Sequence, residues 1–354
     1  MKKRIEWIDV VRAVGMFLII MGHTLETFTF STVGKVIFAV HVPVFFVLSG
    51  YLFKEKPWKV AIKGNFLNLF LPYFVTVIIM FVISWFHQII PGWVNEVDLS
   101  SFIKVALYGS GTQVPSVFDP SQQINAIGAI WFLLAMFVGN LCYNLLVKLT
   151  RGNDYILVVA VILCTYFGFY LTRHGIYLPW SINAALASQS FYFAGHLIKS
   201  FSLLEKNSYS WLILGLVLWG ASTHSGFFYL NVAQADSPFW AVLGGIGGSY
   251  VLMWGAKFLC QHHVPLKAVK YYGQLSLIVL CVHLIDINMF TISRKIYEAM
   301  MLMTNRPVLS VSVEILYRLF LTILGIIIIP RLPYLRSFYL ARKYPFSNWK
   351  HAAK

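Results

Sequence analysis

Residues 9–26 read DVVRAVGMFLIIMGHTLE, an apolar stretch that also carries the ionisable residues Asp9, Arg12, His23 and Glu26. Apolar runs of similar length recur along the 354-residue chain, in which 58% of residues are hydrophobic and 12% are charged. A soluble domain carries about 25% charged residues, and a helix needs about 20 apolar residues to cross a bilayer. Runs of this length predict helices and not barrel strands. The sequence therefore predicts an all-α, polytopic membrane protein.

The apolar runs predict a bundle of ten transmembrane helices that forms a single domain, residues 1–354. Their expected ranges are 9–30, 33–53, 66–87, 126–147, 155–171, 180–199, 210–230, 239–260, 272–291 and 309–329. The longest connection, 88–125, is predicted to lie outside and to hold a short helix that starts at Asp98 and Ser100. The run GGIGGSY at 244–250 lacks the strand and the lysine of a phosphate loop. We expect its small residues to let helices approach closely.

Lysine and arginine predict the orientation of the bundle. They concentrate in segments on the side of the N-terminus, among them Lys2, Lys3 and the tail 331–354. The positive-inside rule then places both termini in the cytoplasm. The same bias explains the net charge of +15, so nucleic-acid binding is not expected.

Arg12 and His23 are eleven residues apart on the first predicted helix. At 100° and 1.5 Å per residue they differ by about 20° in direction and about 16 Å in height, so they share one face. This spacing suits an elongated ligand that enters from inside and ends near the outer layer. Asp9 and Arg12 are at i,i+3 and are expected to pair, with Asp9 orienting Arg12.

Ionisable side chains inside a membrane usually face a protein interior or an aqueous cavity. The predicted spans place four of them on one level, about 10–14 Å beneath the outer surface; these are His23, His41, His283 and Arg318. Trp131 and Asn125 mark a similar region at the start of the fourth span.

Each of these groups also has a structural explanation. His41 precedes Pro43 by two residues. Proline has no backbone N–H and leaves a carbonyl without its helical partner, so His41 would serve only to bond that carbonyl. The Glu314–Arg318 pair, at i,i+4, would neutralise itself, and Asp286 would hold His283 at i,i+3.

Four stretches carry a family resemblance: RIEWIDVVRAVGMFLIIMGH (4–23), HVPVFFVLSGYLF (41–53), AIWFLLAMF (129–137) and YYGQLSLIVLCVHL (271–284). In this order they resemble the signatures of the membrane-bound acyltransferase-3 family, and within it the fucose 4-O-acetylase-like branch. In KGNFLNLFLPY (63–73), Asn65 and Asn68 stand where the family commonly has basic residues, which leaves Lys59 and Lys63 nearby.

The resemblance implies transfer of an acetyl group from cytoplasmic acetyl-CoA to a sugar hydroxyl of a surface polysaccharide or its lipid-linked precursor, in a bacterial plasma membrane. Arg12 with Asp9, Lys59 and Lys63 would hold the CoA phosphates. His23 would act as general base or carry the acyl group, with Glu26 beside it. The predicted substrate-binding residues are His41, Ser49, Trp131, Asn125, His283 and Arg318; of these Ser49, His283 and Arg318 are candidate donors to the thioester oxyanion. No metal is expected.

Two other functions compete with an acyltransferase. A glycan or glycolipid transporter or flippase also fits a polar layer in a helical bundle, although paired broken helices in two halves are not seen in the sequence. A sensor or scaffold gives no reason for the alignment of Arg12 with His23. The acyl group, the acceptor sugar and the oligomeric state stay open at this point.

Overall fold

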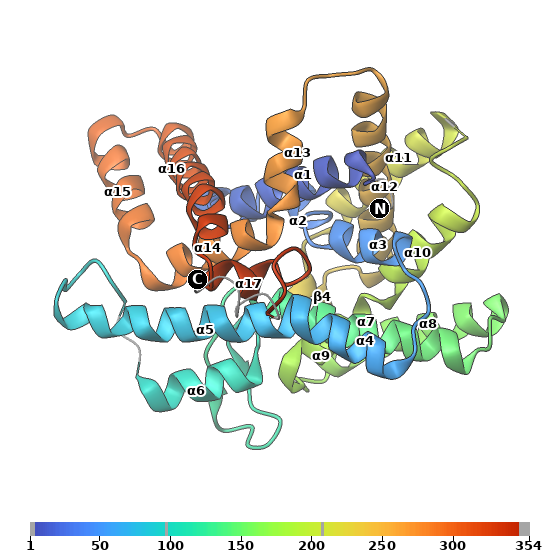
Figure 1. Ribbon diagram of the computed structural model, residues 1–354, viewed down its shortest axis with the longest axis horizontal. Coiled ribbons are helices and arrows are strands. Elements are labelled where there is room, and N and C mark those ends of the chain that lie inside the picture. Colours follow the sequence, from blue (N-terminus) through green and yellow to red (C-terminus); the bar gives the residue numbers. More distant parts are fainter. Residues whose placement is uncertain (1–3, 96–97, 207–208, 347–354) are drawn as a thin grey trace. The chain divides into compact units, whose positions relative to one another are not determined.

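The computed structural model describes residues 4–95, 98–206 and 209–346, and its secondary structure is almost entirely helical (Figure 1). Strands in this part of the chain form two-residue antiparallel pairs, β1 (Val114–Pro115) with β2 (Gln123–Ile124) and β3 (Phe228–Tyr229) with β4 (Gln234–Ala235). The prediction of an all-α protein is confirmed.

Six segments of the described chain are long and apolar enough to cross a membrane, or seven if one bent helix pair counts as a span. They are Thr32–Tyr51, Trp58–His87, Trp131–Leu149, Asp154–Arg173, Pro238–Gln261 and Pro307–Arg331, with the pair Lys267–Gln274 and Ser276–Met289, bent by 70°. This set indicates a multi-pass membrane protein. The other predicted spans contain helices below the length of about 20 residues that a straight crossing needs. The structure thus supports six or seven of the ten.

The helices gather into two compact units, each built from discontinuous segments. The first comprises the described residues within 1–56, 139–177 and 182–276. Its helices are α1 (Glu6–Gly22), α2 (Thr32–Phe38), α3 (Pro43–Tyr51), α8 (Asp154–Arg173), α9 (Ile182–Ala187), α10 (Gln189–Ser200), α11 (Tyr209–Ser225), α12 (Pro238–Gln261), α13 (Lys267–Gln274) and the second half of α7 (Trp131–Leu149).

The second unit comprises the described residues within 57–138, 178–181 and 277–354. Its helices are α4 (Trp58–Asn65), α5 (Leu71–Ser84), α6 (Leu99–Tyr108), α14 (Ser276–Met289), α15 (Ile292–Thr304), α16 (Pro307–Ile328), α17 (Leu335–Tyr339) and the first half of α7. The expectation of a single domain stays a prediction.

Glycines allow helices of the first unit to approach closely. A methyl group at Gly50 of α3 would overlap the backbone of Tyr192 in α10, and one at Gly195 of α10 would overlap the carbonyl of Val47. On α12, Gly247 of the glycine run faces the carbonyl of Gly215 in α11, where an added Cβ would lie 2.7 Å away. Lipid gives apolar helices no hydrophobic reason to associate, so such close backbone approach supplies the packing energy.

The first predicted span, 9–30, is wrong at its C-terminal end, because α1 ends at Gly22. The Thr24 hydroxyl donates to the carbonyl of Ile20 at 2.6 Å, and Glu26 takes a left-handed φ of 45°. Both features compete with a continuing helix. His23 is therefore the exposed residue that ends α1, and it does not lie seven residues below the outer end of a longer helix.

The helix predicted within the long connection is present as α6. The Asp98 carboxylate accepts the backbone N–H of Ser101 at 2.8 Å and the hydroxyl of Ser100 at 2.6 Å. The Ser100 hydroxyl, followed by the Ser101 N–H, lowers the pKa of Asp98. The helix closes at Gly109, whose φ of 68° is one that a glycine adopts without strain.

The sequence predicts a connection at residues 292–308, whereas the structure holds α15 there. Arg294, Lys295 and Glu298 make this helix too polar to be recognised as a span. It is followed by Asn305 in a left-handed conformation and by Pro307 at the first turn of α16, so the two helices form a hairpin (Figure 1).

Candidate active site

The N-terminal end of α1 holds a group of paired charges. Asp9 is buried, and Arg4 grips its carboxylate with two hydrogen bonds, from Nε at 2.7 Å and Nη2 at 2.9 Å. Arg12 Nη1 lies 3.7 Å from the same carboxylate, so the predicted contact of Asp9 with Arg12 exists but is the longer one. The Arg12 side chain keeps 34% of its surface exposed.

Helix α13 adds a further cation to this end of α1. Lys270 Nζ lies 2.6 Å from the Glu6 carboxylate, and a methyl group at Gly273 would overlap the Asp9 carbonyl, so the two helices are closely packed. Arg4, Arg12 and Lys270 thus surround two carboxylates. We name this set, Arg4, Glu6, Asp9, Arg12 and Lys270, the N-terminal charge cluster.

His23 and His41 lie at the opposite end of α1. They lie near enough to interact electrostatically, His23 at the exposed end of the helix and His41 buried in the turn between α2 and α3. An added Cβ at Gly22 would sit 3.3 Å from the Phe38 ring, which shows how closely α1 approaches α2 here. Glu26, three residues beyond His23, is exposed.

His41 makes the contact that its structural explanation required. Its Nδ1 lies 3.1 Å from the Ile37 carbonyl oxygen. Its ring packs edge-on against the Phe38 ring, with 4.7 Å between the ring centroids. A carbonyl only accepts, so Nδ1 carries a proton and Nε2 is the nitrogen left for another partner. Ser49 lies half-buried on α3, the helix that follows this turn.

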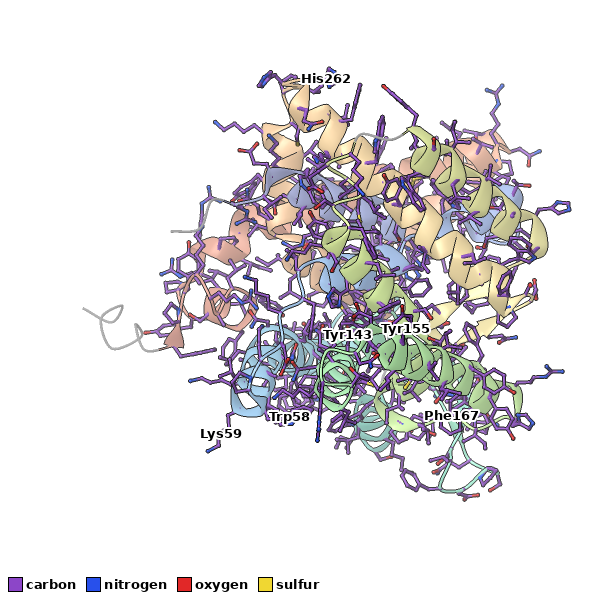
Figure 2. All side chains as sticks on the ribbon, turned by 90° about the vertical axis from the view of Figure 1, so that its right-hand side faces the viewer. Trp58, Lys59, Tyr143, Tyr155, Phe167 and His262 are labelled. Atoms are coloured by element: carbon purple, nitrogen blue, oxygen red, sulfur yellow. The ribbon has the colours of Figure 1, made fainter. Side chains whose placement is uncertain are left out.

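The basic residues predicted for donor binding in the second unit lie on α4. Lys59 and Lys63 are one helical turn apart and both are exposed. Figure 2 shows the Lys59 side chain projecting away from the ribbon. Asn68 points its amide nitrogen back to the carbonyl of Gly64, in the helix itself.

A buried polar network joins α14, α15 and α16. Arg318 donates to Glu314 Oε1 from Nη2 at 2.7 Å and to the Ser293 hydroxyl at 3.0 Å, and Tyr317 donates to Asp286 at 3.0 Å. All but Tyr317 are buried. The i,i+4 pairing of Glu314 with Arg318 is confirmed.

His283 is buried one turn before Asp286 on α14. Arg318 lies near enough to Asp286 to interact with it electrostatically. The predicted substrate-binding residues His283 and Arg318 therefore belong to one polar region of the second unit.

Trp131 and Asn125 flank the start of α7. Trp131 is the buried first residue of that helix and packs against the backbone at Gly111, where an added Cβ would overlap its ring. Asn125 is exposed and follows β2. Trp131 thus acts in packing, and Asn125 is the more accessible of the two.

Arg4, Ser293 and Tyr317 are the polar partners that sequence reasoning missed. Arg4 lies before the first predicted span, and only the start of α1 at Glu6 brings it back onto Asp9. Ser293 belongs to α15, which was not expected as a helix. Tyr317 directly precedes Arg318, a position that does not by itself reveal contact with α14.

The model of the family described as Acyltransferase domain (Acyl_transf_3) matches residues 5–330. No curated protein and no solved structure gives a match. The matched range contains all the predicted site residues, from Asp9 to Arg318. The chain therefore belongs to the acyltransferase 3 family and is a membrane acyltransferase.

Proposed function

We propose that the protein moves an acetyl group from cytoplasmic acetyl-CoA to a sugar hydroxyl of a surface polysaccharide or its lipid-linked precursor. The observation that carries this proposal is the arrangement along α1: three cations around two carboxylates at one end, and at the other an exposed histidine within electrostatic range of a second histidine. The family supplies the acyl-transfer chemistry. The fucose 4-O-acetylase-like branch stays part of the proposal.

The N-terminal charge cluster is proposed to bind the CoA phosphates. Arg4 donates two hydrogen bonds to the Asp9 carboxylate, and Arg12, whose contact with Asp9 is longer, keeps 34% of its side-chain surface exposed. This exposed guanidinium is the proposed donor of charge-assisted hydrogen bonds to phosphate. From Arg12 to His23 the helix rises about 16 Å, a distance suited to the thin pantetheine arm. Lys59 and Lys63 stay proposed donor-binding residues.

His23 is proposed to take the proton of the sugar hydroxyl while its oxygen attacks the thioester carbonyl. Collapse of the tetrahedral intermediate forms the ester, breaks the carbon–sulfur bond and releases CoA, whose thiolate receives the proton. In the second route His23 itself accepts the acetyl group and then passes it to the sugar. Glu26 is close enough in sequence to steady an imidazolium in either route.

The oxyanion needs a donor, for which Ser49, His283 and Arg318 are proposed. Arg318 has an argument of its own, because its Nη1 has no hydrogen-bond partner within the described residues. His41 and Asn125, with Trp131 as a packing residue, complete the proposed acceptor region. A transporter would move the same glycan unchanged, so release of free thiol separates the two functions.

The test is an assay of free thiol from acetyl-CoA with the purified full-length protein, with and without glycan acceptors. We expect thiol release that rises with acceptor, and a fall of about 10²–10⁴ in turnover for His23→Ala. His174→Ala is the matched control, since His174 is exposed at the end of α8. Normal turnover of the His23 variant would remove His23 from the chemistry, and a folded protein that neither binds CoA nor transfers acetyl would refute the function.

Arg12 is tested in the same assay. Arg12→Ala should raise the KM for acetyl-CoA by roughly tenfold or more with little change in kcat, because a binding contact is lost. Arg173→Ala removes an exposed arginine at the end of α8 and should leave KM unchanged. An unaltered KM in Arg12→Ala would exclude Arg12 from donor binding.

A further inference from the structure

A cavity of about 500 Å³ lies in the first unit between α2 and α11, apart from the residues assigned to acyl transfer. Helix α2 contributes Thr32, Lys35 and Val36 to its lining. Helix α11 contributes Leu216, Trp219, Gly220, Thr223 and His224. This volume falls within the range of about 300–1,000 Å³ that is usual for ligand sites.

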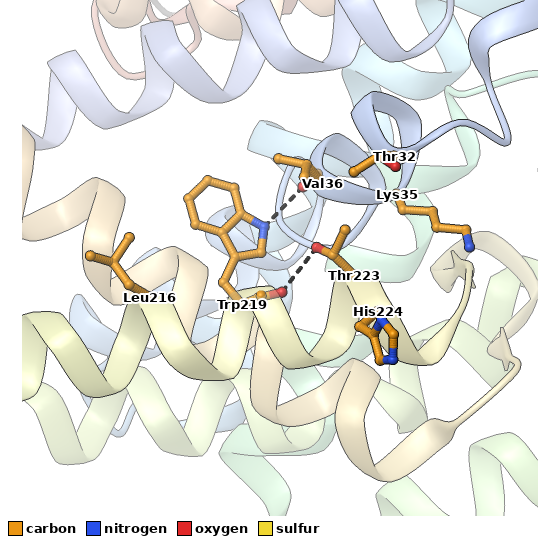
Figure 3. Close-up of a pocket in the computed structure, with 8 residues that line it drawn as sticks. Thr32, Lys35, Val36, Leu216, Trp219, Thr223 and His224 are labelled. Atoms are coloured by element: carbon orange, nitrogen blue, oxygen red, sulfur yellow. Dashed lines mark hydrogen bonds between the residues drawn. The ribbon is translucent and has the colours of Figure 1, made fainter.

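The wall of the cavity is held in place by Trp219. Its indole Nε1 donates to the Val36 carbonyl at 2.9 Å and so ties α11 to α2 (Figure 3). The Thr223 hydroxyl donates to the Trp219 carbonyl at 3.0 Å. The cavity is therefore bounded by bonded elements, and both of its walls belong to the same compact unit.

The two ends of the cavity differ in chemistry. Figure 3 shows Lys35 and His224 toward one end, Leu216 toward the other and Trp219 between them. Leu216 and His224 are about two helical turns apart on α11, or about 12 Å. None of the described lining residues is acidic, and within the described chain neither Lys35 nor His224 forms an ion pair.

The apolar end continues onto a surface suited to lipid. Ile213, Leu214, Leu216 and Val217 are all exposed on α11. In a multi-pass membrane protein such a run faces acyl chains, and tryptophan prefers the interface between chains and head groups. A ligand of this cavity thus meets donors at its head and hydrocarbon along its tail.

We propose that the cavity binds the phosphate head of an amphiphilic lipid, with Lys35 as the main phosphate contact and Trp219 against the first part of the chain. Basic pockets between membrane helices bind such head groups, and an ammonium forms charge-assisted hydrogen bonds with phosphate oxygens. The phosphate comes either from a membrane phospholipid or from a polyprenyl phosphate of the kind that carries glycans. The second source would place a lipid-linked acceptor on the protein.

The test measures binding to the full-length protein in uncharged maltoside micelles. The probes are phosphatidylglycerol, a polyprenyl phosphate, diacylglycerol, which has no phosphate, and inorganic phosphate, which has no chain. We expect saturable binding of at least one phosphate lipid and much weaker binding of the other two probes. The tighter of the two phosphate lipids identifies the source.

Two variants test the site, one by removing the charge of Lys35 and the other by filling the cavity. Lys35→Gln should weaken phosphate-lipid binding roughly 10- to 100-fold, as expected for one hydrogen bond to a charged group. Gly220→Leu should block the cavity sterically, because Gly220 lines it. A Cβ at Gly220 meets nothing within 4 Å, so we expect the variant to keep the packing of the helices.

Each variant has a matched control. Lys104→Gln removes an exposed lysine of α6, and Gly255→Leu adds the same side chain at a glycine of α12 that also has open space around it. Both should bind lipid as the unaltered protein does.

The proposal is overturned if neither phosphate lipid binds, if inorganic phosphate binds as tightly as the lipids, or if both site variants bind like their controls. Lys35 would then only extend its ammonium to water. No acyl donor enters the assay, so these outcomes leave the acyl-transfer proposal untouched.

Discussion

Glu314 and Glu298 each pair with an arginine four residues away, but in opposite surroundings. The Glu314 and Arg318 side chains are 0% and 6% exposed with their charged atoms 2.7 Å apart, whereas Glu298 and Arg294, 2.8 Å apart, are 53% and 80% exposed. Burial makes the first pair costly to break, since removing one partner leaves an uncompensated charge. Water and salt screen the exposed Glu298–Arg294 pair, so breaking it costs little stability.

Glu314→Gln should therefore lower the free energy of unfolding by about 3–5 kcal/mol, and the control Glu298→Gln by no more than about 0.5 kcal/mol. Denaturant unfolding of both variants in detergent micelles measures the difference. Equal effects of the two substitutions would contradict the buried ion pair.

The residue scale also shows what spacing alone reveals. The Glu314–Arg318 pair was predictable because i,i+4 side chains of any helix are neighbours. The partner of Asp9 was not, because contact with Arg4 depends on where α1 begins.

At the scale of elements, α3 and α10 touch through their backbones at Gly50 and Gly195. The glycine of the second signature, HVPVFFVLSGYLF, is thus explained by packing at Gly50.

Gly50→Ala should destabilise the protein by about 1–3 kcal/mol, because the new methyl group overlaps the Tyr192 backbone. Gly255→Ala, in open space on α12, should instead be neutral or stabilise by up to about 1 kcal/mol through helix propensity. Melting temperatures in micelles measure both, and a Gly50 variant as stable as its control would refute the close contact.

Helix α6 depends on its cap at Asp98, whose pKa is lowered in the folded protein by the Ser100 hydroxyl and the Ser101 N–H. A carboxyl with a lowered pKa contributes stability that is complete above its ordinary pKa of about 4 and is lost as pH falls through the lowered value. Hydrogen exchange of α6 should therefore stay slow at neutral pH and accelerate only in acid.

Asp98→Ala should show fast exchange in α6 already at neutral pH, while Asp98→Asn, which also caps, should retain protection there without the acid response. Protection in Asp98→Ala equal to that of the unaltered protein would show that the cap does not hold α6.

For the whole molecule, the number of crossings decides the positions of the termini. Six crossings return the chain to its starting side, and a seventh through the bent pair α13 and α14 would not. The predicted cytoplasmic position of both ends, in a bacterial plasma membrane, therefore requires an even number. Lys2 and Lys3, which support this orientation, lie outside the described residues, as does the tail beyond residue 346.

Reporter fusions test this topology. A fluorescent protein that matures only in the cytoplasm should be bright at the C-terminus, and a phosphatase active only outside should be active when inserted near Asn125 in the 88–125 connection. An active phosphatase at the C-terminus would overturn the orientation and favour an odd number of crossings.

The sequence by itself determined the all-α class, the multi-pass membrane character and the family, because composition, apolar run length and short motifs are local properties. The shared face of Arg12 and His23 stays a prediction. Only the tertiary structure decided that α1 stops at Gly22, that Arg4 bonds Asp9, that His41 lies within electrostatic range of His23 and that α15 brings Ser293 to Arg318. These features depend on where helices end and which backbones approach. Hydrophobicity does not encode which helices approach, because lipid tails are as apolar as the helix side chains. It does not encode the end of α1 either, where the Thr24 hydroxyl bonds the Ile20 carbonyl and Glu26 takes a left-handed φ.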